Sequence, residues 1–481
     1  MKRNTITKYM AGIAAAAMLC ACSDFTEIDQ KGLNTLSRVS DLDMLLNAEY
    51  SVRTTDVQEV CGDLIYGYSP LATILKPAVK TRASILMGWD EEGHDATLPE
   101  LTSSDSHYAN CYEYIGRIAN PIISLADAAD GDQTKKMAVK AEAYVVRAYF
   151  HLLAAQKFAP VYDKATASNT LALAYVKEDQ DIKQPTVPVS LAEFYSNVVS
   201  DCDAALAIPE FPDFGVNNMR FGRAAAYAVK AHALMCMQEP QEAAKAAAEA
   251  LKIRNTITDY FTMLAPQMSM DGSSYQAIVR PKVDVAEDYF SDYSIEFYDT
   301  YPAFSSLEDG HCIKTNFNTM NKMYGALGDA SMILLAEPGL TITYDLESSW
   351  GTIPLRSTQM ILIQAEAAIE AGNIDNAMGY LDQIRAVRIA PDVYQPLQGT
   401  VTTKADAIAH LKQTALGENM FTIWSFSDQK RWTRLADYRE TKTRTLGGLT
   451  MSLTPDSKMW VFPIPQNVIN NNPNFRPYLN N

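Results

Sequence analysis

Apolar residues recur at intervals of three and four along most of the chain, a spacing that predicts amphipathic helices. We expect helices over Ser106–Leu125 and Lys136–Phe158, packed against each other as an antiparallel pair. Ser190, followed three residues later by Glu193, forms a capping box that opens a further helix ending near Ile208. These segments predict a mostly α protein.

Two predicted helical hairpins share one design. The first joins Arg223–Met237 to Gln241–Leu251 across a break at Glu239-Pro240, and the second joins Ser357–Glu370 to Ile374–Val387. Small residues occupy matching positions in the first helix of each hairpin, at Ala231, Ala233, Ala365 and Ala367. Small residues let helices approach closely, and stacked pairs bury a shared core, as in tetratricopeptide repeats. We therefore expect a tetratricopeptide-like helical-repeat scaffold.

The pattern changes between the two hairpins, at about 256–354. Pro, Gly and aromatic residues interrupt it there, and no long amphipathic helix is evident. We interpret this stretch as a large, irregular, loop-rich insertion that could include short strands. Near the C-terminus, Met459–Pro465 is predicted to be extended and 470–474 to be rich in turns. Trp424 and Trp432 lie on a helical segment, where we expect them in the core.

The first residues have the features of a bacterial lipoprotein signal. Three cations, at Lys2, Arg3 and Lys8, precede an apolar stretch that is too short to span a bilayer. The stretch ends in Leu19-Cys20-Ala21-Cys22, the spacing of a lipobox. We expect residues 1–21 to be a signal peptide, Cys22 to be lipidated, and 22–481 to form a single domain attached to a membrane through this lipid anchor. The alternative is an ordinary signal peptide with Cys22 unmodified.

Charge and motif content exclude several classes of function. The chain has 481 residues and a net charge of -16, and it has no basic stretch that could neutralise nucleic-acid phosphates. The cysteines are scattered without zinc spacing, and the acidic clusters at 90–95 and 178–181 lack the spacing of a calcium-binding EF-hand loop. We expect no metal and no cofactor. Since no nucleophile elbow, zinc-protease, phosphate-loop or dinucleotide motif occurs, we also expect no enzyme activity.

Several segments of the chain form a characteristic set. The most specific is Ala141–Phe150, AEAYVVRAYF, which is followed by Lys157–Val161. The others are Leu36–Tyr50, Tyr114–Asn120, Ala365–Ala367, Ile384–Arg388, Pro463–Pro465 and Asn472–Asn474. In their order, these segments resemble the SusD/RagB family of nutrient-binding lipoproteins from the outer membrane of Bacteroidetes, with Ala159 where the family usually has Gly. The resemblance covers nearly the whole mature chain. It implies a protein of the outer membrane, exposed at the cell surface, that captures oligosaccharides and delivers them to a SusC-like TonB-dependent transporter. Peptide capture, as in RagB-like members, is the alternative that the family implies.

Aromatic side chains in the irregular segments are the candidates for contact with a sugar. A sugar ring has an apolar face and a polar rim, so a flat aromatic with polar neighbours suits it. Two groups qualify: Tyr66, Tyr68 and Trp89 in the early segment, and Tyr289, Phe290, Tyr293, Phe297, Tyr298, Tyr301 and Phe304 in the insertion, with Trp350 near its end. From them we select Trp89, Tyr293, Tyr298 and Trp350 as ligand-binding residues, with burial in the core as the alternative for each. A third hypothesis is a scaffold that binds only a protein partner.

Overall fold

The computed structural model describes residues 36–62, 75–181, 183–263, 287–291, 306–315, 352–446 and 448–480. Helices dominate these residues, and the strands among them form two sheets of two strands each. This confirms the predicted mostly α fold. The signal peptide, Cys22 and most of the predicted insertion lie outside the described residues.

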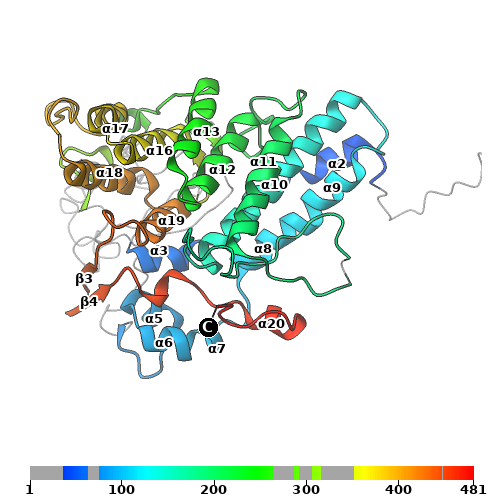
Figure 1. Cartoon of the computed structure of the whole chain (residues 1–481), viewed down its shortest axis with the longest axis horizontal. Coiled ribbons are helices and arrows are strands. Elements are labelled where there is room, and N and C mark those ends of the chain that lie inside the picture. The colour runs from blue at the N-terminus through cyan, green and yellow to red at the C-terminus, as the bar shows by residue number, and fades with distance from the viewer. Residues whose placement is uncertain are drawn as a thin grey trace, which may run out of the picture.

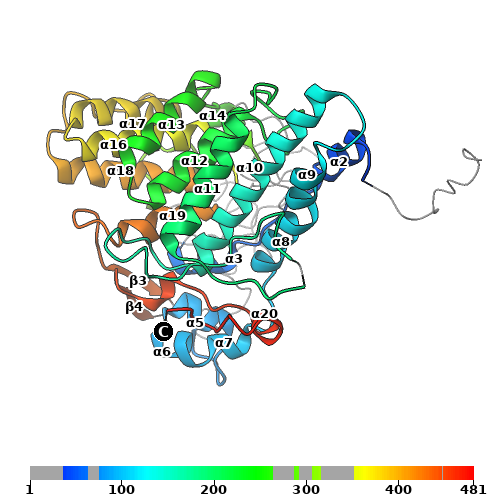
Figure 2. The same cartoon turned by 45° about the vertical axis from the view of Figure 1, so that its right-hand side comes forward.

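A series of helices forms a curved array, in which they lie side by side (Figures 1 and 2). In chain order they are α8 (Ser106–Tyr114), the π-helix η1 (Ile115–Ala119), α9 (Asn120–Leu125), α10 (Gln133–Phe158), α11 (Leu191–Leu206), α12 (Arg223–Cys236), α13 (Pro240–Ile253), α16 (Ser357–Glu370), α17 (Ile374–Arg388) and α18 (Lys404–Asn419). Each of these helices from α10 to α17 packs on the next. The array therefore forms the repeat scaffold that the sequence predicts.

The two predicted hairpins stack through matching positions. Helix α13 of the first packs against α16 of the second. The Gln364 side chain donates to the Ala244 carbonyl at 2.6 Å, and the Gln241 side chain donates to the Ala367 carbonyl at 2.8 Å. The four small residues singled out from the sequence, Ala231, Ala233, Ala365 and Ala367, are all buried. The repeat interface is thus fixed in register by two amide side chains.

The predicted helix over Ser106–Leu125 differs from expectation in one respect. Five residues of it, Ile115–Ala119, are π-helical, and the Asn120 N–H bonds to the Ile115 carbonyl, five residues back. Pro121 follows directly and has no N–H to donate to the usual carbonyl four residues back. Because the π-helical turn contains one residue more than an α-helical turn, the side chains of α9 do not continue the helical periodicity of α8.

Capping residues define the ends of the neighbouring helices. The Ser190 hydroxyl accepts from the Glu193 N–H at 3.2 Å, so the N-cap half of the predicted capping box is present. Helix α10 begins at Gln133, three residues before the predicted start, because Asp132 caps it by accepting from the Lys135 N–H at 2.8 Å. Such caps satisfy N–H groups that have no partner within the helix.

Shorter elements cover the lower side of the array in Figure 1. They are α3 (Thr55–Cys61), α5 (Arg82–Gly88), α6 (Glu91–Ala96), α7 (Leu98–Leu101), α19 (Ile423–Trp432), the antiparallel hairpin β3 (Lys442–Leu446) and β4 (Leu449–Leu453), and the C-terminal segment with η4 (Lys458–Trp460) and α20 (Gln466–Asn471). Helix α2 (Val39–Leu45) lies beside α10. Two expectations need correction here: Lys458–Trp460 is a 3₁₀ turn, and Gln466–Asn471 is a short helix after Pro465, which acts as its N-cap.

The described part of the insertion contains short helical segments, including residues 312–315, and one strand. Helix α14 spans Tyr260–Met263, and β1 (Asp288–Phe290) pairs antiparallel with β2 (Leu355–Arg356), which leads directly into α16. Phe290 is buried and stacks on Phe221 with ring centroids 4.1 Å apart. The insertion is therefore tied to the scaffold core at this strand.

A buried ion cluster joins the two layers. The Lys157 ammonium, on α10, lies 2.7 Å from an Asp56 carboxylate oxygen and 2.8 Å from one of Asp105. The Arg82 guanidinium contacts both of the same carboxylates. Burial alone would raise the pKa of Asp56, but the charges of Lys157 and Arg82 outweigh it and hold that pKa far below its usual range. Two cations balance two anions, and the cluster fixes α3 and α5 against α10.

Candidate functional site

Most of the residues selected from the sequence lie outside the described part of the chain. This holds for Cys22, Tyr293, Tyr298 and Trp350, as well as for Tyr66 and Tyr68. The segment that carries Tyr66 and Tyr68 joins α3 to α5, two helices that pack against each other.

Trp89 is buried at the end of α5, with 7% of its surface exposed. Its indole N–H donates to the Val60 carbonyl at 2.8 Å, and the Arg444 guanidinium lies 3.9 Å from the centre of its ring. Its φ of 48° places it in the left-handed region, which is costly for a bulky residue. Core packing, the alternative given above for Trp89, describes its position in this structure.

Arg444 links the hairpin to the ends of α3 and α5. It donates to the Glu59 carbonyl at 3.1 Å and to the Met87 carbonyl. Burial lowers the pKa of Arg444 to about 10. Burial and then the nearby negative charge of Asp56 raise the pKa of the Glu59 carboxyl to about 8. Trp89, Arg444 and Glu59 thus form a desolvated corner between α3, α5 and β3.

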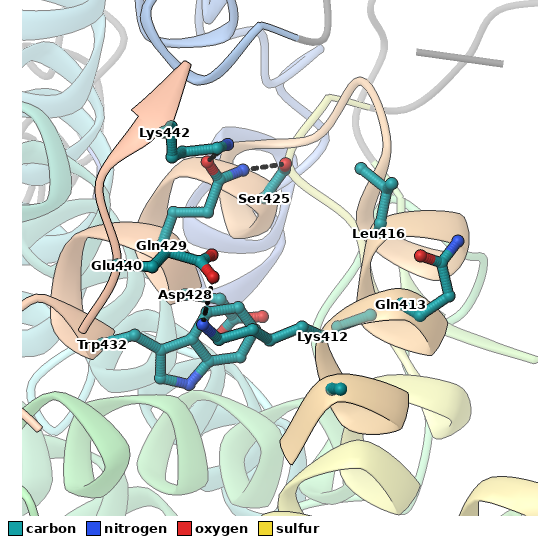
Figure 3. Close-up of a pocket in the computed structure, with 11 residues that line it drawn as sticks. Lys412, Gln413, Leu416, Ser425, Asp428, Gln429, Trp432, Glu440 and Lys442 are labelled. Carbon is teal, nitrogen blue, oxygen red and sulfur yellow. Dashed lines mark hydrogen bonds and ion pairs between the residues drawn. The ribbon is translucent and has the colours of Figure 1, made fainter. Parts of the chain in front are cut away.

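A hollow of about 320 Å³ opens between α18, α19 and β3, beside this corner. We call it the α18–α19 hollow. Figure 3 shows Lys412 extending from α18 toward Glu440 and Trp432, with Leu416 and Gln413 on the same helix. Its other lining residues are Ala409, Ala415, Ser425, Asp428, Gln429 and Lys442.

The α18–α19 hollow combines an apolar floor with a charged rim. Trp432 supplies an indole ring whose N–H is held by Glu366 at 3.2 Å, and only 7% of this residue is exposed. On the rim, the Lys412 ammonium lies 3.0 Å from the Glu440 carboxylate. The Gln429 amide donates to the Ser425 hydroxyl at 3.1 Å. A floor and rim of this kind suit a ligand with one apolar face and several hydroxyl groups.

Strand β3 connects the hollow to the corner. Lys442, on the wall of the hollow, donates to the carbonyl of Cys61 at 3.2 Å, and Cys61 is the last residue of α3. Arg444, two residues further along β3, lies on Trp89. Residues two apart in a strand point to the same side. The hollow, the corner and the end of α3 that leads to Tyr66 and Tyr68 are therefore neighbours, and together they form the candidate site.

The α18–α19 hollow was not predicted from the sequence. Its lining comes from 409–442, where no single motif marks it, and Trp432 was expected in the core, where it is indeed almost wholly buried. The one signal available was the hairpin: residues 442–446 and 449–453 alternate in character around Gly447-Gly448, a typical two-residue turn.

Other groups with potential chemistry have structural partners. Asp90 caps α6 by accepting from the Gly93 N–H at 3.0 Å, and Glu178 pairs with Arg147. The two helical histidines, His151 and His232, are buried as expected, and burial lowers the pKa of each to about 3. All five cysteines within the described ranges are buried.

The described residues bring together no group of three or more His, Cys, Asp or Glu side chains able to hold a metal. Among the helices that the structure describes, none has the length and apolar character needed to cross a bilayer.

Part of the chain matches a known protein family, and its fold matches solved structures. Residues 54–234 match the SusD-like family described as starch-binding and associating with the outer membrane. A SusD superfamily protein from Bacteroides thetaiotaomicron has a similar structure, with a TM-score of 0.61 and 17% identity, covering 92% of this chain and 99% of that one. A SusD-like carbohydrate-binding protein from Bacteroides vulgatus gives a TM-score of 0.59 and 14% identity, covering 91% and 97%. At such low identities, the structural likeness shows a common fold alone. No curated protein matches the chain by sequence.

Proposed function

Because residues 54–234 match the SusD-like family, we propose that this chain is a cell-surface lipoprotein that captures oligosaccharides and delivers them to a SusC-like TonB-dependent transporter. The match to a starch-binding family of the outer membrane is the observation that carries this proposal. In it, the chain binds and releases its ligand without breaking a bond.

The anchor in this proposal is Cys22. Acyl chains on the mature N-terminus supply membrane affinity at about 0.8 kcal/mol for each buried CH₂ group, so the rest of the chain needs no membrane contact of its own. The preceding Leu19-Cys20-Ala21 supports lipidation at this cysteine. The transporter would then take up what the anchored protein collects.

The geometry of the candidate site supports a sugar as ligand. The α18–α19 hollow offers the Trp432 ring as an apolar floor, with ammonium, carboxylate and amide groups on its rim. Sugar hydroxyls both donate and accept, so they can pair with such a mixed rim. We propose that Tyr293, Tyr298 and Trp350 also bind the oligosaccharide, with their rings as platforms for further sugar units.

The ring platform can be tested by changing the ring and the hydroxyl separately. Tyr293→Ala and Tyr298→Ala should each weaken oligosaccharide binding about tenfold, because aromatic contacts contribute about 0.5–1.5 kcal/mol beyond their buried area. The matched Tyr→Phe variants keep the ring and should retain most of the affinity. Titration calorimetry measures the affinities, and thermal unfolding checks that each variant is folded. A Tyr→Ala variant that binds as tightly as its Tyr→Phe control removes that tyrosine from the site.

The hollow is tested by filling it. Leu416 is half-buried on its wall, so Leu416→Trp places a larger ring in the space, whereas Leu416→Met conserves the volume. We expect the Trp variant to lose affinity and the Met variant to keep it. Equal affinity in both would show that the ligand does not enter the α18–α19 hollow. Binding of peptides, in place of sugars, would favour a RagB-like function.

A further inference from the structure

A second and larger hollow lies at the opposite end of the helical array from the α18–α19 hollow. It has a volume of about 780 Å³ and opens between α9 and the segment 175–189. We call it the α9 hollow. In Figures 1 and 2, α9 and α18 stand at opposite sides of the array. None of the residues selected from the sequence as ligand-binding lines this space.

The floor of the α9 hollow is held by buried polar contacts. Asn120 accepts from the Arg147 guanidinium at 3.2 Å and donates to the Val176 carbonyl at 3.3 Å. Arg147 also pairs with Asp201 at 2.7 Å, and Tyr175 donates to the same carboxylate at 2.6 Å. With both sides of the Asn120 amide bonded, α9 and the start of the facing segment are fixed relative to each other. The hollow is thus organised before any ligand enters.

The far wall is held by the end of the chain. The side-chain amide of Asn472 donates to the Thr186 carbonyl at 2.9 Å, and that of Asn474 donates to the same carbonyl at 3.0 Å. Val189 is paired with Leu173 through a backbone hydrogen bond of 3.1 Å. These contacts come from the scaffold and the C-terminal segment. The α9 hollow is therefore built without the insertion.

The π-helical turn opens the near wall. Gly116 lies within this turn and lines the hollow, and a Cβ atom added to it would meet nothing within 4 Å. Pro121, on the same wall, leaves the helix without one of its usual N–H donors. π-Helical turns occur frequently at functional sites. Because Gly116 has no side chain, this turn leaves open the space that a ligand would need.

Carboxylates outnumber cations around the α9 hollow. Its charged lining residues are Lys177, Glu178 and Asp181, and the Arg147 guanidinium beside them is shared by Glu178 and Asp201. Burial opposes ionisation of Glu178, but hydrogen bonds from its own backbone N–H and from Arg147 outweigh it and lower its pKa, so this acid is charged at neutral pH. A lining with more carboxylates than cations repels an anionic ligand. The lining therefore favours a neutral ligand over an acidic one.

The remaining lining alternates between apolar and polar groups. Leu125 and Val187 are among the large apolar residues left exposed, at 37% and 63%, and both belong to this hollow together with Pro121. Lys177, Gln184 and Glu178 bring donors and acceptors to the same space. An apolar contact combined with neighbouring donors and acceptors matches the two sides of a sugar ring.

We propose that the α9 hollow is a second carbohydrate site, which binds a neutral oligosaccharide. The inference rests on the proposed function, since it assumes that the chain handles sugars. Two sites on one chain would hold a long glycan more tightly than either site alone, because the second contact becomes intramolecular. The α9 hollow would serve any neutral glycan that reaches it, independently of the aromatics in the insertion.

Hydrogen exchange of the mature chain tests this proposal directly. The probes are neutral malto-, xylo- and manno-trisaccharides, with an oligogalacturonide as acidic comparator and a mixed peptide digest. We expect at least one neutral trisaccharide to slow exchange in 116–125 and 175–189, and the affinity there to change little as salt is raised. Protection elsewhere but never in these segments overturns the second site and leaves the proposed function intact. Protection of these segments only by the acidic probe or by peptides overturns the ligand class.

Gly116 provides a matched pair of variants. Gly116→Phe places a ring in the open space, whereas Gly116→Ala adds only a methyl group. With a neutral trisaccharide, we expect the Phe variant to bind about one molecule per chain and the Ala variant about two, as in the unmodified chain. Circular dichroism checks folding, and Leu125→Trp, on the exposed rim, replaces Gly116→Phe if that variant does not fold. Equal stoichiometry in the blocked and control variants shows that the hollow is not a carbohydrate site.

Discussion

Lys157 is the cation on which the contact between the two layers depends, and replacing it should destabilise the whole chain. Its ammonium contacts Asp56 and Asp105 at 2.7 and 2.8 Å, and its side chain is 2% exposed. Lys157→Met keeps the length of the apolar stem and removes only the charge. The cluster then holds two carboxylates and a single cation, Arg82. A buried negative charge is left without a partner.

The expected loss is about 4 kcal/mol. At an effective dielectric constant of about 20, each of the two contacts contributes about 6 kcal/mol of Coulomb attraction, and the cost of desolvating the ammonium offsets a large part of their sum. Removing one member of a buried ion pair costs about 3–5 kcal/mol in other proteins. Arg82 remains to neutralise part of the charge, which places the expectation in the middle of that range.

The assay is urea unfolding of both variants, followed by tryptophan fluorescence and circular dichroism. Lys245→Met is the matched control, because Lys245 pairs with Glu242 on the exposed side of α13 and should contribute less than about 1 kcal/mol. The pKa of Asp56 and that of Asp105 are held below the unfolded value of about 3.9, so their contribution is complete above that pH and is lost as pH falls further. The difference in the free energy of unfolding between Lys157→Met and the unmodified chain should therefore become smaller below about pH 4. A Lys157→Met chain as stable at neutral pH as the control would refute the reasoning.

Two further predictions concern a buried acid and a turn. Burial and then Asp56 raise the pKa of Glu59 to about 8, so the stability that neutral Glu59 provides is present below the unfolded pKa of about 4.3 and is lost progressively up to about pH 8. Glu59→Gln should remove this part of the pH dependence, and an unchanged dependence of the urea midpoint on pH across that range would contradict the prediction. Gly372 ends α16 with a φ of 76°, and an added Cβ there meets nothing within 4 Å, so Gly372→Ala should cost about 1–2 kcal/mol from backbone strain alone. Gly372→Asn, which tolerates this conformation better, should cost less in the same unfolding assay.

The sequence predicted the repeat scaffold because its helices carry their own signals. The pairs α12–α13 and α16–α17 show apolar periodicity, small residues at the crossing and clear breaks, and each of these features acts within a few neighbouring residues. The π-helical turn at Ile115–Ala119 was not predicted, since one additional residue in a turn hardly alters an apolar pattern. The short helix at Gln466–Asn471 was missed because it carries no buried residue and hence no periodicity.

The candidate site was harder to predict, because burial depends on residues far apart in the chain. Trp89 looks like a loop aromatic in the sequence, and its burial follows from Arg444, more than 300 residues later, which covers its ring. The two hollows likewise have walls from separate segments: the α9 hollow is closed by Asn472 and Asn474, which bond to Thr186. Tyr293, Tyr298 and Trp350 remain predictions of the sequence alone.

The central claim is that this chain binds oligosaccharide and leaves it intact. The most direct test is titration calorimetry of a soluble form that begins after Cys22, against host and plant oligosaccharides and a mixed peptide digest. The ligand is recovered and analysed afterwards. The account predicts saturable binding of at least one oligosaccharide that is recovered unchanged. Binding of peptides alone, or recovery of a shortened or otherwise altered sugar, would contradict it.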